Sequence, residues 1–213
     1  MSKKMLFILG NLINSLNILL AIYFFNALPD KMITHVNFDN VPNGYMSKTS
    51  FLIFYPLFFI IIFSLSFFIT IKDPRNANQE KKPLYFLFIA IPILGVIVFI
   101  ALIRFNLGQP TDIGLIISIA VGLLFIILGN YLPKIKPNYT FGIKLPWTLA
   151  NEEVWQKTHR LSGYLWIMAG IIMMASYFIS PNAYVFLGVL IIPLLVVPTI
   201  YAYRLYHKLE KGQ

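Results

Sequence analysis

Most of the residues that could carry chemistry lie in one segment of the chain, residues 129–163. This segment, called the inner motif, combines polar, aromatic and turn-forming residues: Asn130, Pro133, Asn138, Gly142, Pro146, Trp147, Thr148, Asn151, Glu152, Trp155, His159 and Arg160. Glu152 and His159 could serve as a general acid or base. On one helix they would be two turns apart, about 10 Å along its axis, which is too far for a direct acid–base pair. One hypothesis is therefore an intramembrane enzyme in which either residue acts on a substrate positioned by Trp147 and Asn130.

The same residues also fit a structural role. Asn151 is a favourable N-cap, and Glu152 and Glu153 would lie in the first turn of the following helix, where the helix dipole favours negative charge. Trp155 and His159, four residues apart, would share one face of that helix. A tryptophan at headgroup level, with basic residues toward anionic lipid, is typical of an interfacial anchor. The residues alone leave the inner motif open between a binding or catalytic site and a structural anchor.

A second polar segment, residues 29–50, contains the other candidate site residues: His35, Asn37, Pro42, Gly44, Tyr45 and Lys48. Residues 32–38 partly alternate between apolar and polar side chains, and residues 42–44 (Pro-Asn-Gly) are a turn signal, so we predict a short strand and a turn. His35 could titrate or bind a metal, but no second histidine or carboxylate cluster shares this segment at ligand spacing. With no cysteine and no tight cluster of metal ligands, the sequence predicts neither a metal site nor a cofactor.

The composition indicates that a membrane-embedded fold positions these segments. Hydrophobic residues make up 58% of the 213 residues and charged residues 12%, with a mean hydropathy of +0.75, which excludes a water-soluble protein. Six apolar stretches are long enough to span a bilayer, at residues 5–28, 51–71, 84–104, 113–132, 162–179 and 184–203. They lack the two-residue alternation of barrel strands. We therefore predict an all-α polytopic membrane protein, a six-helix transmembrane bundle with a small extracellular loop structure and an ordered cytoplasmic loop.

The distribution of basic residues predicts the orientation of this bundle. With the amino terminus inside, 14 of the 17 Lys and Arg residues fall in cytoplasmic segments, as the positive-inside rule requires. Both termini and the inner motif are therefore expected in the cytoplasm, and residues 29–50 outside. The same distribution accounts for the net charge of +9 without nucleic-acid binding. No ionisable residue lies near the middle of a predicted span, which argues against an ion-coupled transporter.

Small and amide residues within the spans predict how the helices pack. Gly114, Ser118 and Gly122 recur every four residues, so another helix could approach this face closely, either within the bundle or in a homodimer. An unpaired amide is costly in lipid, and three asparagines in the first span are therefore expected to face inward and to bond to neighbours. They recur at every third position: Asn11, Asn14 and Asn17.

The inner motif resembles the sequence signature of the SdpI-type family, bacterial immunity proteins against the sporulation-delaying cannibalism toxin. This resemblance rests on the following residues: Gly129-Asn130, Pro133, Asn138, Gly142-Ile143, Pro146-Trp147-Thr148-Leu149, Asn151-Glu152, Val154-Trp155 and Thr158-His159-Arg160. The outer segment resembles the uncharacterised amino-terminal module that often accompanies this family, through Leu28-Pro29, His35, Asn37, Pro42-Asn43-Gly44 and Ser47-Lys48. The resemblance implies a three-span module at 1–110 with outer loop 29–50, and a three-span SdpI-like module at 111–213 with inner motif 129–163.

The resemblance further implies a multi-pass protein of the bacterial cell membrane that gives resistance to a secreted antimicrobial peptide toxin. It also implies a second role, as a signalling receptor that sequesters a cytoplasmic winged-helix repressor, with no direct binding of nucleic acid by this chain. The expected partners are membrane lipid, the toxin, the repressor and a second copy through Gly114, Ser118 and Gly122. An intramembrane enzyme acting on a lipid or peptide is the alternative hypothesis, and a transporter fits less well.

Overall fold

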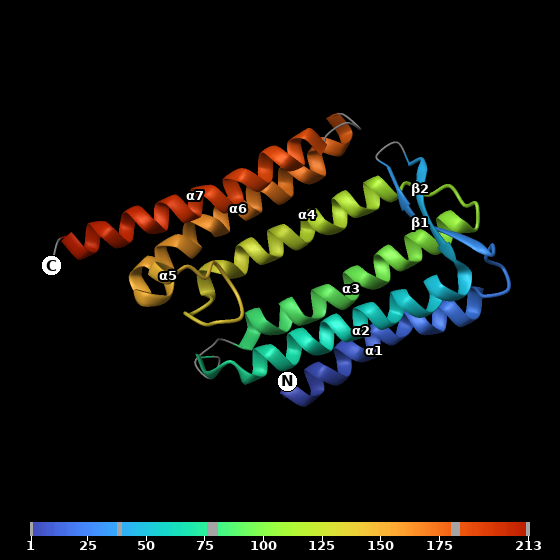
Figure 1. Ribbon diagram of the computed structural model, residues 1–213, viewed down its shortest axis with the longest axis horizontal. Coiled ribbons are helices and arrows are strands. Elements are labelled where there is room, and N and C mark those ends of the chain that lie inside the picture. Colours follow the sequence, from blue (N-terminus) through green and yellow to red (C-terminus); the bar gives the residue numbers. More distant parts are fainter. Residues whose placement is uncertain (1, 38–39, 76–80, 180–183, 212–213) are drawn as a thin grey trace. The chain divides into compact units, whose positions relative to one another are not determined.

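The computed structural model describes residues 2–37, 40–75, 81–179 and 184–211, except for the side chains of 81–83, 87 and 184–193. Each predicted apolar stretch falls on one long helix (Figure 1): α1 Lys3–Phe24, α2 Lys48–Lys72, α3 Lys81–Asn106, α4 Ile113–Tyr131, α6 Glu152–Ile179 and α7 Tyr184–Lys211. The two polar segments contain the short elements β1 Lys31–Val36, β2 Pro42–Ser47, η2 Leu132–Lys134 and α5 Pro146–Ala150.

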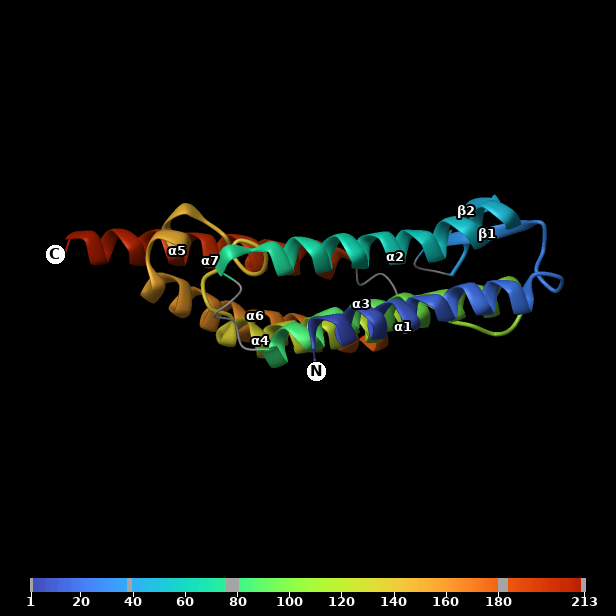
Figure 2. The ribbon, with the colours of Figure 1, turned by 90° about the horizontal axis from the view of Figure 1, so that it is seen from below.

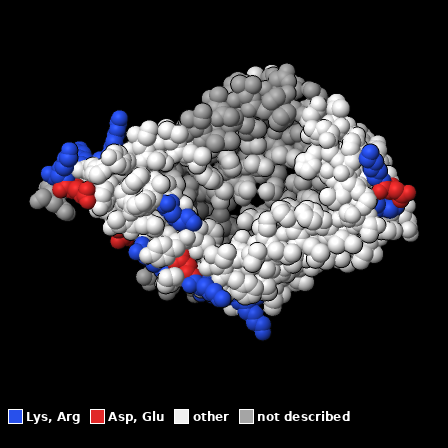
Figure 3. All heavy atoms as spheres, viewed as in Figure 1, with Lys and Arg blue, Asp and Glu red and all other residues white. Residues whose placement is uncertain are grey.

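Within the described part of the chain, five helices, α1, α2, α3, α4 and α6, are long and apolar enough to cross a membrane, which confirms an all-α membrane fold. On the face shown in Figure 3, the flanks of the helices carry few charges, and most Lys and Arg side chains lie near the ends of elements. The predicted span at 184–203 begins in residues whose side chains lie outside the described part of the chain. The count of six spans and the cytoplasmic location of both termini therefore stay predictions.

The packing divides the chain into two compact units. The first contains Met1–Phe68 and Tyr85–Val121, and the second contains Ile69–Leu84 and Gly122–Gln213. The boundaries fall inside α2, α3 and α4, because one end of each of these helices packs in the first unit and the other end in the second. These packing units are not a test of the predicted sequence modules, 1–110 and 111–213, which stay a prediction.

Aromatic rings form much of the core of the first unit. The ring of Phe7 on α1 lies 5.0 Å from that of Phe67 on α2, and Phe51 stacks on Phe99 of α3 at 5.8 Å. Because bulky rings from three helices meet, a small residue is needed where a ring of α2 lies against the backbone of α1. Gly10 is that residue, since a Cβ atom at this position would overlap the ring of Phe63.

The prediction that the three asparagines of α1 face inward is confirmed for two of them. Asn14 and Asn17 are fully buried, whereas Asn11 is half-buried and donates from Nδ2 to the Phe7 carbonyl of its own helix. The predicted hydrogen bonds to neighbouring helices are wrong for Asn14 and Asn17, whose carboxamides have no partner among the described residues. Their burial therefore follows from helix packing and not from pairing.

The outer segment forms an antiparallel hairpin, in which β1 pairs with β2. The prediction of a turn at 42–44 is wrong, since Pro42 begins β2 and Gly44 lies opposite His35. The chain reverses between Asn37 and Val41 instead. There the Asn37 N–H donates to the Val41 carbonyl and the Asn37 side-chain oxygen accepts from the Val41 N–H, both at 2.8 Å. Asn37 thus closes the connection, which leaves 42–44 free to extend.

Glycines bring α4 and α6 into close contact in the second unit. Gly122 faces Gly170, and Gly129 faces Gly163, where a Cβ atom on either partner would lie only 2.7 Å from the other's carbonyl oxygen. The pairing is antiparallel, and α7 lies alongside α6 (Figures 1 and 2). Gly122 therefore packs against another helix of the same chain, which was one of the two predicted alternatives. The other alternative, a homodimer through this face, stays a prediction.

Candidate functional site

The inner motif folds into a compact structure, called the inner cap, made of η2, α5, their connections and the first two turns of α6. Pro146 starts α5, where its missing N–H is not needed. The hydroxyl of Thr148 is fully buried in the first turn of α5. It accepts from the Leu145 N–H at 2.9 Å and lies 2.8 Å from the Ile143 carbonyl, to which it can donate. Thr148 therefore fixes the start of α5 from within.

Asn138 organises the turn that precedes α5. Its side-chain oxygen accepts from the N–H groups of Thr140 and Phe141, at 2.8 and 2.6 Å, and its Nδ2 donates to the Lys136 carbonyl at 2.9 Å. Only 2% of Asn138 is exposed. A buried amide that satisfies three backbone groups is difficult to replace, because any apolar side chain would leave those groups unpaired. Asn138 is therefore a structural centre of the cap.

His159 joins the turn to α6 through both nitrogen atoms of its ring. The Ile143 N–H donates to Nε2 at 2.9 Å, so Nε2 must be unprotonated, and Nδ1–H then donates to the Trp155 carbonyl at 2.8 Å. The ring is fully buried and stacks on the indole of Trp155, with 4.0 Å between centroids. A neutral histidine with both nitrogens bonded to backbone has no free lone pair for a substrate. This geometry supports a structural role for His159 over general-base catalysis.

Trp155 and Gly142 complete this centre. Trp155 is fully buried, and its Nε1–H donates to the Ile135 carbonyl at 2.7 Å. Gly142 has a φ of +100°, and a Cβ atom there would overlap Nε2 of His159 and lie 3.2 Å from the Trp155 ring. Only glycine combines this backbone conformation with so close an approach.

The other predicted residues lie at the edge of the cap. Asn151 caps α6 as expected, since its side-chain oxygen accepts from the N–H groups of Glu153 and Val154, at 2.9 and 3.1 Å. Trp147 is half-buried and meets Tyr203 of α7 edge-on, with 5.4 Å between ring centroids. Five members of the motif are exposed: Asn130, Pro133, Pro146, Glu152 and Arg160. The structure thus separates a buried group that builds the cap from an exposed group that is available to partners.

Two residues that contact the cap lie in the segment after α2, and the sequence pattern did not single them out as site residues. Oδ2 of Asp73 accepts from the Tyr139 N–H at 2.8 Å and from the Thr140 hydroxyl at 2.7 Å. The guanidinium of Arg75 lies over the Tyr139 ring, 4.5 Å from its centroid. The available signal was a carboxylate directly after an apolar span, within an otherwise basic segment, Lys72-Asp73-Pro74-Arg75.

The hydrogen bonds to Asp73 favour its charged form. Partial burial raises the pKa of the Asp73 carboxyl, but the hydrogen bonds from Thr140, Arg75 and Tyr139 outweigh this effect, so the pKa lies below its usual value of 3.8. A carboxyl group whose pKa is lower in the folded state than in the unfolded state stabilises the fold at pH values above its usual pKa. That contribution is therefore present at neutral pH and is lost as the pH falls below 3.8 through the lowered pKa.

We expect Asp73→Asn to loosen the cap around Tyr139 without unfolding the helices. The amide keeps the size of the side chain but removes the charge that strengthens its hydrogen bonds. Hydrogen exchange at the Tyr139 amide should accelerate roughly tenfold, as expected for one charge-assisted hydrogen bond. The matched control is Asp30→Asn, because Asp30 is 99% exposed and pairs only with Lys48 in the other unit. Equal exchange at Tyr139 in wild type and Asp73→Asn would contradict the role given to Asp73.

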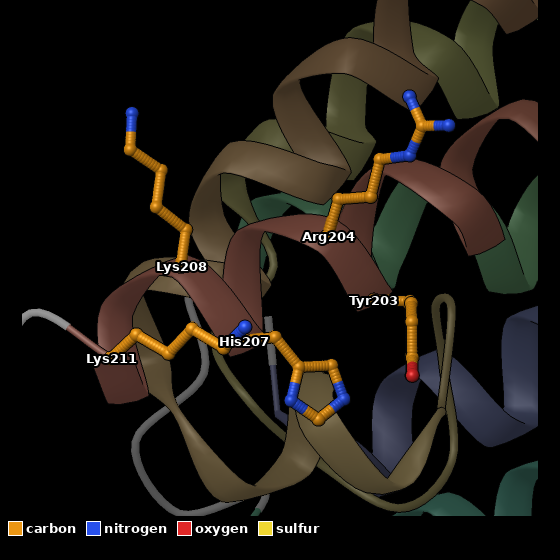
Figure 4. Close-up of a pocket in the computed structure, with 5 residues that line it drawn as sticks. All are labelled: Tyr203, Arg204, His207, Lys208 and Lys211. Atoms are coloured by element: carbon orange, nitrogen blue, oxygen red, sulfur yellow. The ribbon is translucent and has the colours of Figure 1, made fainter.

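Two shallow hollows lie on the second unit. One, of about 540 Å³, is lined by Arg75, Lys136, Pro137, Leu149, Ala150 and Glu152, so it offers charges of both signs beside the cap. The other, of about 620 Å³, lies on the last turns of α7 and is lined by Tyr203, Arg204, His207, Lys208 and Lys211. Figure 4 shows that Arg204 and Lys208 project on one side of α7 and Tyr203 and His207 on another, so these side chains do not converge on one ligand.

Comparison with known proteins shows that the segment containing most of the inner cap is similar to a recognised protein family. Residues 134–202 match the SdpI/YfhL protein family, and residues 12–60 match a domain of unknown function, DUF1648. The chain is 29% identical over 205 residues to the Immunity protein SdpI of Bacillus subtilis (strain 168), covering 95% of this chain and 97% of the relative. No solved structure matches the chain. The predicted resemblance is therefore confirmed: this is a multi-pass bacterial membrane protein similar to the SdpI/YfhL protein family over residues 134–202 and to the Immunity protein SdpI over nearly its whole length.

Proposed function

We propose that this chain is an integral membrane immunity protein that gives its cell resistance to a secreted antimicrobial peptide toxin. The observation that carries the proposal is the similarity to an immunity protein, which extends over 95% of this chain and includes both the hairpin and the inner cap. The arrangement of His159, with both ring nitrogens bonded to backbone, favours this proposal over the intramembrane enzyme.

The outer hairpin is the part of the first unit that we propose meets the toxin. Its exposed surface carries Tyr45, which is 51% exposed and whose ring lies under the Lys31 ammonium group, 4.4 Å from the centroid. An exposed aromatic ring with a cation beside it can bury apolar surface and pair with a carboxylate at once. His35 is exposed on the neighbouring strand, and we propose it as a second contact residue.

We expect Tyr45→Ala to lower survival of a toxin-sensitive host that expresses this chain and is challenged with purified peptide toxin. Loss of one aromatic contact should weaken toxin binding about tenfold or more, while the amount of protein in the membrane stays unchanged. Tyr23→Ala is the matched control, because Tyr23 is also an exposed tyrosine of the first unit, at 78%. Wild-type survival of Tyr45→Ala cells across the toxin dose range would exclude a hairpin contact. Failure of the wild-type chain to protect against any toxin tested would count against immunity itself.

We also propose that the exposed group of the inner motif faces the cytoplasm and binds the winged-helix repressor. Glu152 and Arg160 are exposed on a cap whose buried residues hold it together, and the mixed-charge hollow beside Glu152 offers a docking surface. A second copy of the chain, packed through Gly114 and Ser118, is the other partner proposed. A reporter gene under the repressor, placed in the survival host, separates signalling from protection.

The orientation behind both proposals can be tested because the chain has no cysteine. We expect a single cysteine at Asn43, in the hairpin, to react with an impermeant thiol reagent in intact cells. A cysteine at Lys144, in the cap, should react only after the membrane is opened. Both positions are exposed, so differences in labelling report the side of the membrane. The reverse pattern would overturn the orientation derived from the basic residues.

A further inference from the structure

The outer hairpin is fastened to the helices of the first unit by polar contacts that leave space beneath it. Asn106, at the end of α3, accepts from the Ile33 N–H at 2.7 Å and donates to the Ile33 carbonyl at 2.9 Å. Asn40 accepts from the Ile113 N–H at the start of α4, at 3.2 Å. Lys48 donates to the Leu28 carbonyl at 2.9 Å. The hairpin is thus held at the end of α3 and the start of α4, and the connection that leads into it is held at the start of α2.

An apolar cavity of about 450 Å³ lies under this hairpin. One wall is aromatic and comes from α2, through Phe51, Phe54, Tyr55, Phe58 and Phe59. Val98 and Leu102 of α3 and Ile113 and Ile117 of α4 form other walls, while Thr34 and His35 mark the polar end at the hairpin. Its floor is buried, with Phe51 and Ile113 at 3% exposure, but its rim is open, since Phe54 is 58% and Phe58 is 42% exposed.

The cavity runs along α2. Its lining residues on that helix extend from Phe51 to Phe59, eight residues or about 12 Å along the helix axis. A cavity of this length can hold part of an extended hydrocarbon chain that lies along the helix.

The lining disfavours an extended peptide. Backbone N–H and C=O groups need hydrogen-bond partners away from water. The Tyr55 hydroxyl already donates to the Gly95 carbonyl at 3.1 Å, and the Thr34 hydroxyl already pairs with the His35 ring at 3.0 Å. A hydrocarbon chain needs no such partners. Its source is at hand, because α2, α3 and α4 can cross a membrane and the open rim lies on their apolar flanks.

We propose that this cavity binds one acyl chain of a membrane lipid, with the lipid headgroup beside Thr34 and His35. The polar end of the cavity lies at the hairpin and its apolar end lies along the spanning helices, which is the polarity of a lipid in one leaflet. Because the hairpin is fixed over the cavity, we expect the bound lipid to stay with the protein, unlike the lipids that exchange along the outer flanks of the helices. This site goes beyond immunity and does not depend on it.

The test compares substitutions that fill the cavity with matched substitutions outside it. Ile117→Trp and Val98→Phe fill it from α4 and α3. Ile119→Trp and Ile97→Phe are their controls, since Ile119 and Ile97 are 39% and 40% exposed on the same helices but do not line the cavity. The full chain is purified in detergent, and retained lipid is counted by native mass spectrometry.

We expect wild type and both controls to retain one lipid, and each filling variant to lose about nine-tenths of it, as for an affinity about a hundredfold weaker at a nearly saturated site. Two filling variants on different helices keep the test decisive if one fails to fold. Equal retention in filling variants and controls, or no lipid on wild type, would overturn the proposal. Release of the lipid by purified peptide toxin, with toxin binding lost in the filling variants, would assign the cavity to the peptide instead.

Discussion

Gly142→Ala is expected to break the inner cap and to abolish protection by this chain. Alanine disfavours a φ of +100°, and its Cβ atom would overlap Nε2 of His159. The left-handed conformation costs about 1–2 kcal/mol and overpacking a further 1–3 kcal/mol, so we expect a loss of about 3 kcal/mol in the stability of the cap. The Ile143 N–H would also lose its acceptor. Rapid protease cleavage near Lys144 in inside-out vesicles, together with failed survival, would show this.

Gly108→Ala is the matched control for this effect. Gly108 also has a positive φ, at +71°, but a Cβ atom there would meet nothing within 4 Å. This variant therefore carries the conformational cost without the clash, and we expect it to destabilise the protein by about 1 kcal/mol and to keep the cap resistant to protease. Equal effects at both positions would mean that backbone conformation alone matters, and that the contact with His159 does not.

The helices could be predicted from sequence because each long apolar run requires internal hydrogen bonding in lipid. The hairpin was predicted less well. Pro42, Asn43 and Gly44 have the residue types of a turn, yet the side chain of Asn37 closes the connection earlier in the chain. A local turn signal cannot show whether the side chain of Asn37 or that of Asn43 will accept the hydrogen bond that closes the turn.

The contacts of the inner-motif residues could not be predicted from sequence and needed coordinates. Sequence spacing places Trp155 and His159 on one face of a helix, and the structure stacks their rings. Sequence spacing does not reveal that the Ile143 N–H donates a hydrogen bond to Nε2 of His159. Asp73 was missed for a different reason. It contacts Thr140 across 67 positions of the chain, and no local periodicity encodes such a contact.

Gly170→Leu is expected to separate α4 from α6 and to remove most of the protein from the membrane. A Cβ atom at Gly170 would overlap the Gly122 carbonyl oxygen and lie 3.1 Å from the Ile126 backbone nitrogen. Backbone atoms cannot rotate away as a side chain can, so the helices themselves must move apart. We expect a loss of about 3 kcal/mol, the upper end of the usual range for overpacking.

Ala175→Leu is the matched control, because Ala175 lies five residues further along α6 and is exposed. In lipid an added apolar group on an exposed flank meets a medium like itself, so this variant should keep the wild-type thermal midpoint in detergent. Gly163→Leu should behave like Gly170→Leu, since Gly163 meets Gly129 in the same seam. The cap residues of α6 end at His159, about one turn before Gly163, so a shift of the helix at Gly163 moves His159 as well. If Gly170→Leu accumulated and melted like Ala175→Leu, the seam would not hold α4 against α6, and the cap would have to be supported by α5 and α7 alone.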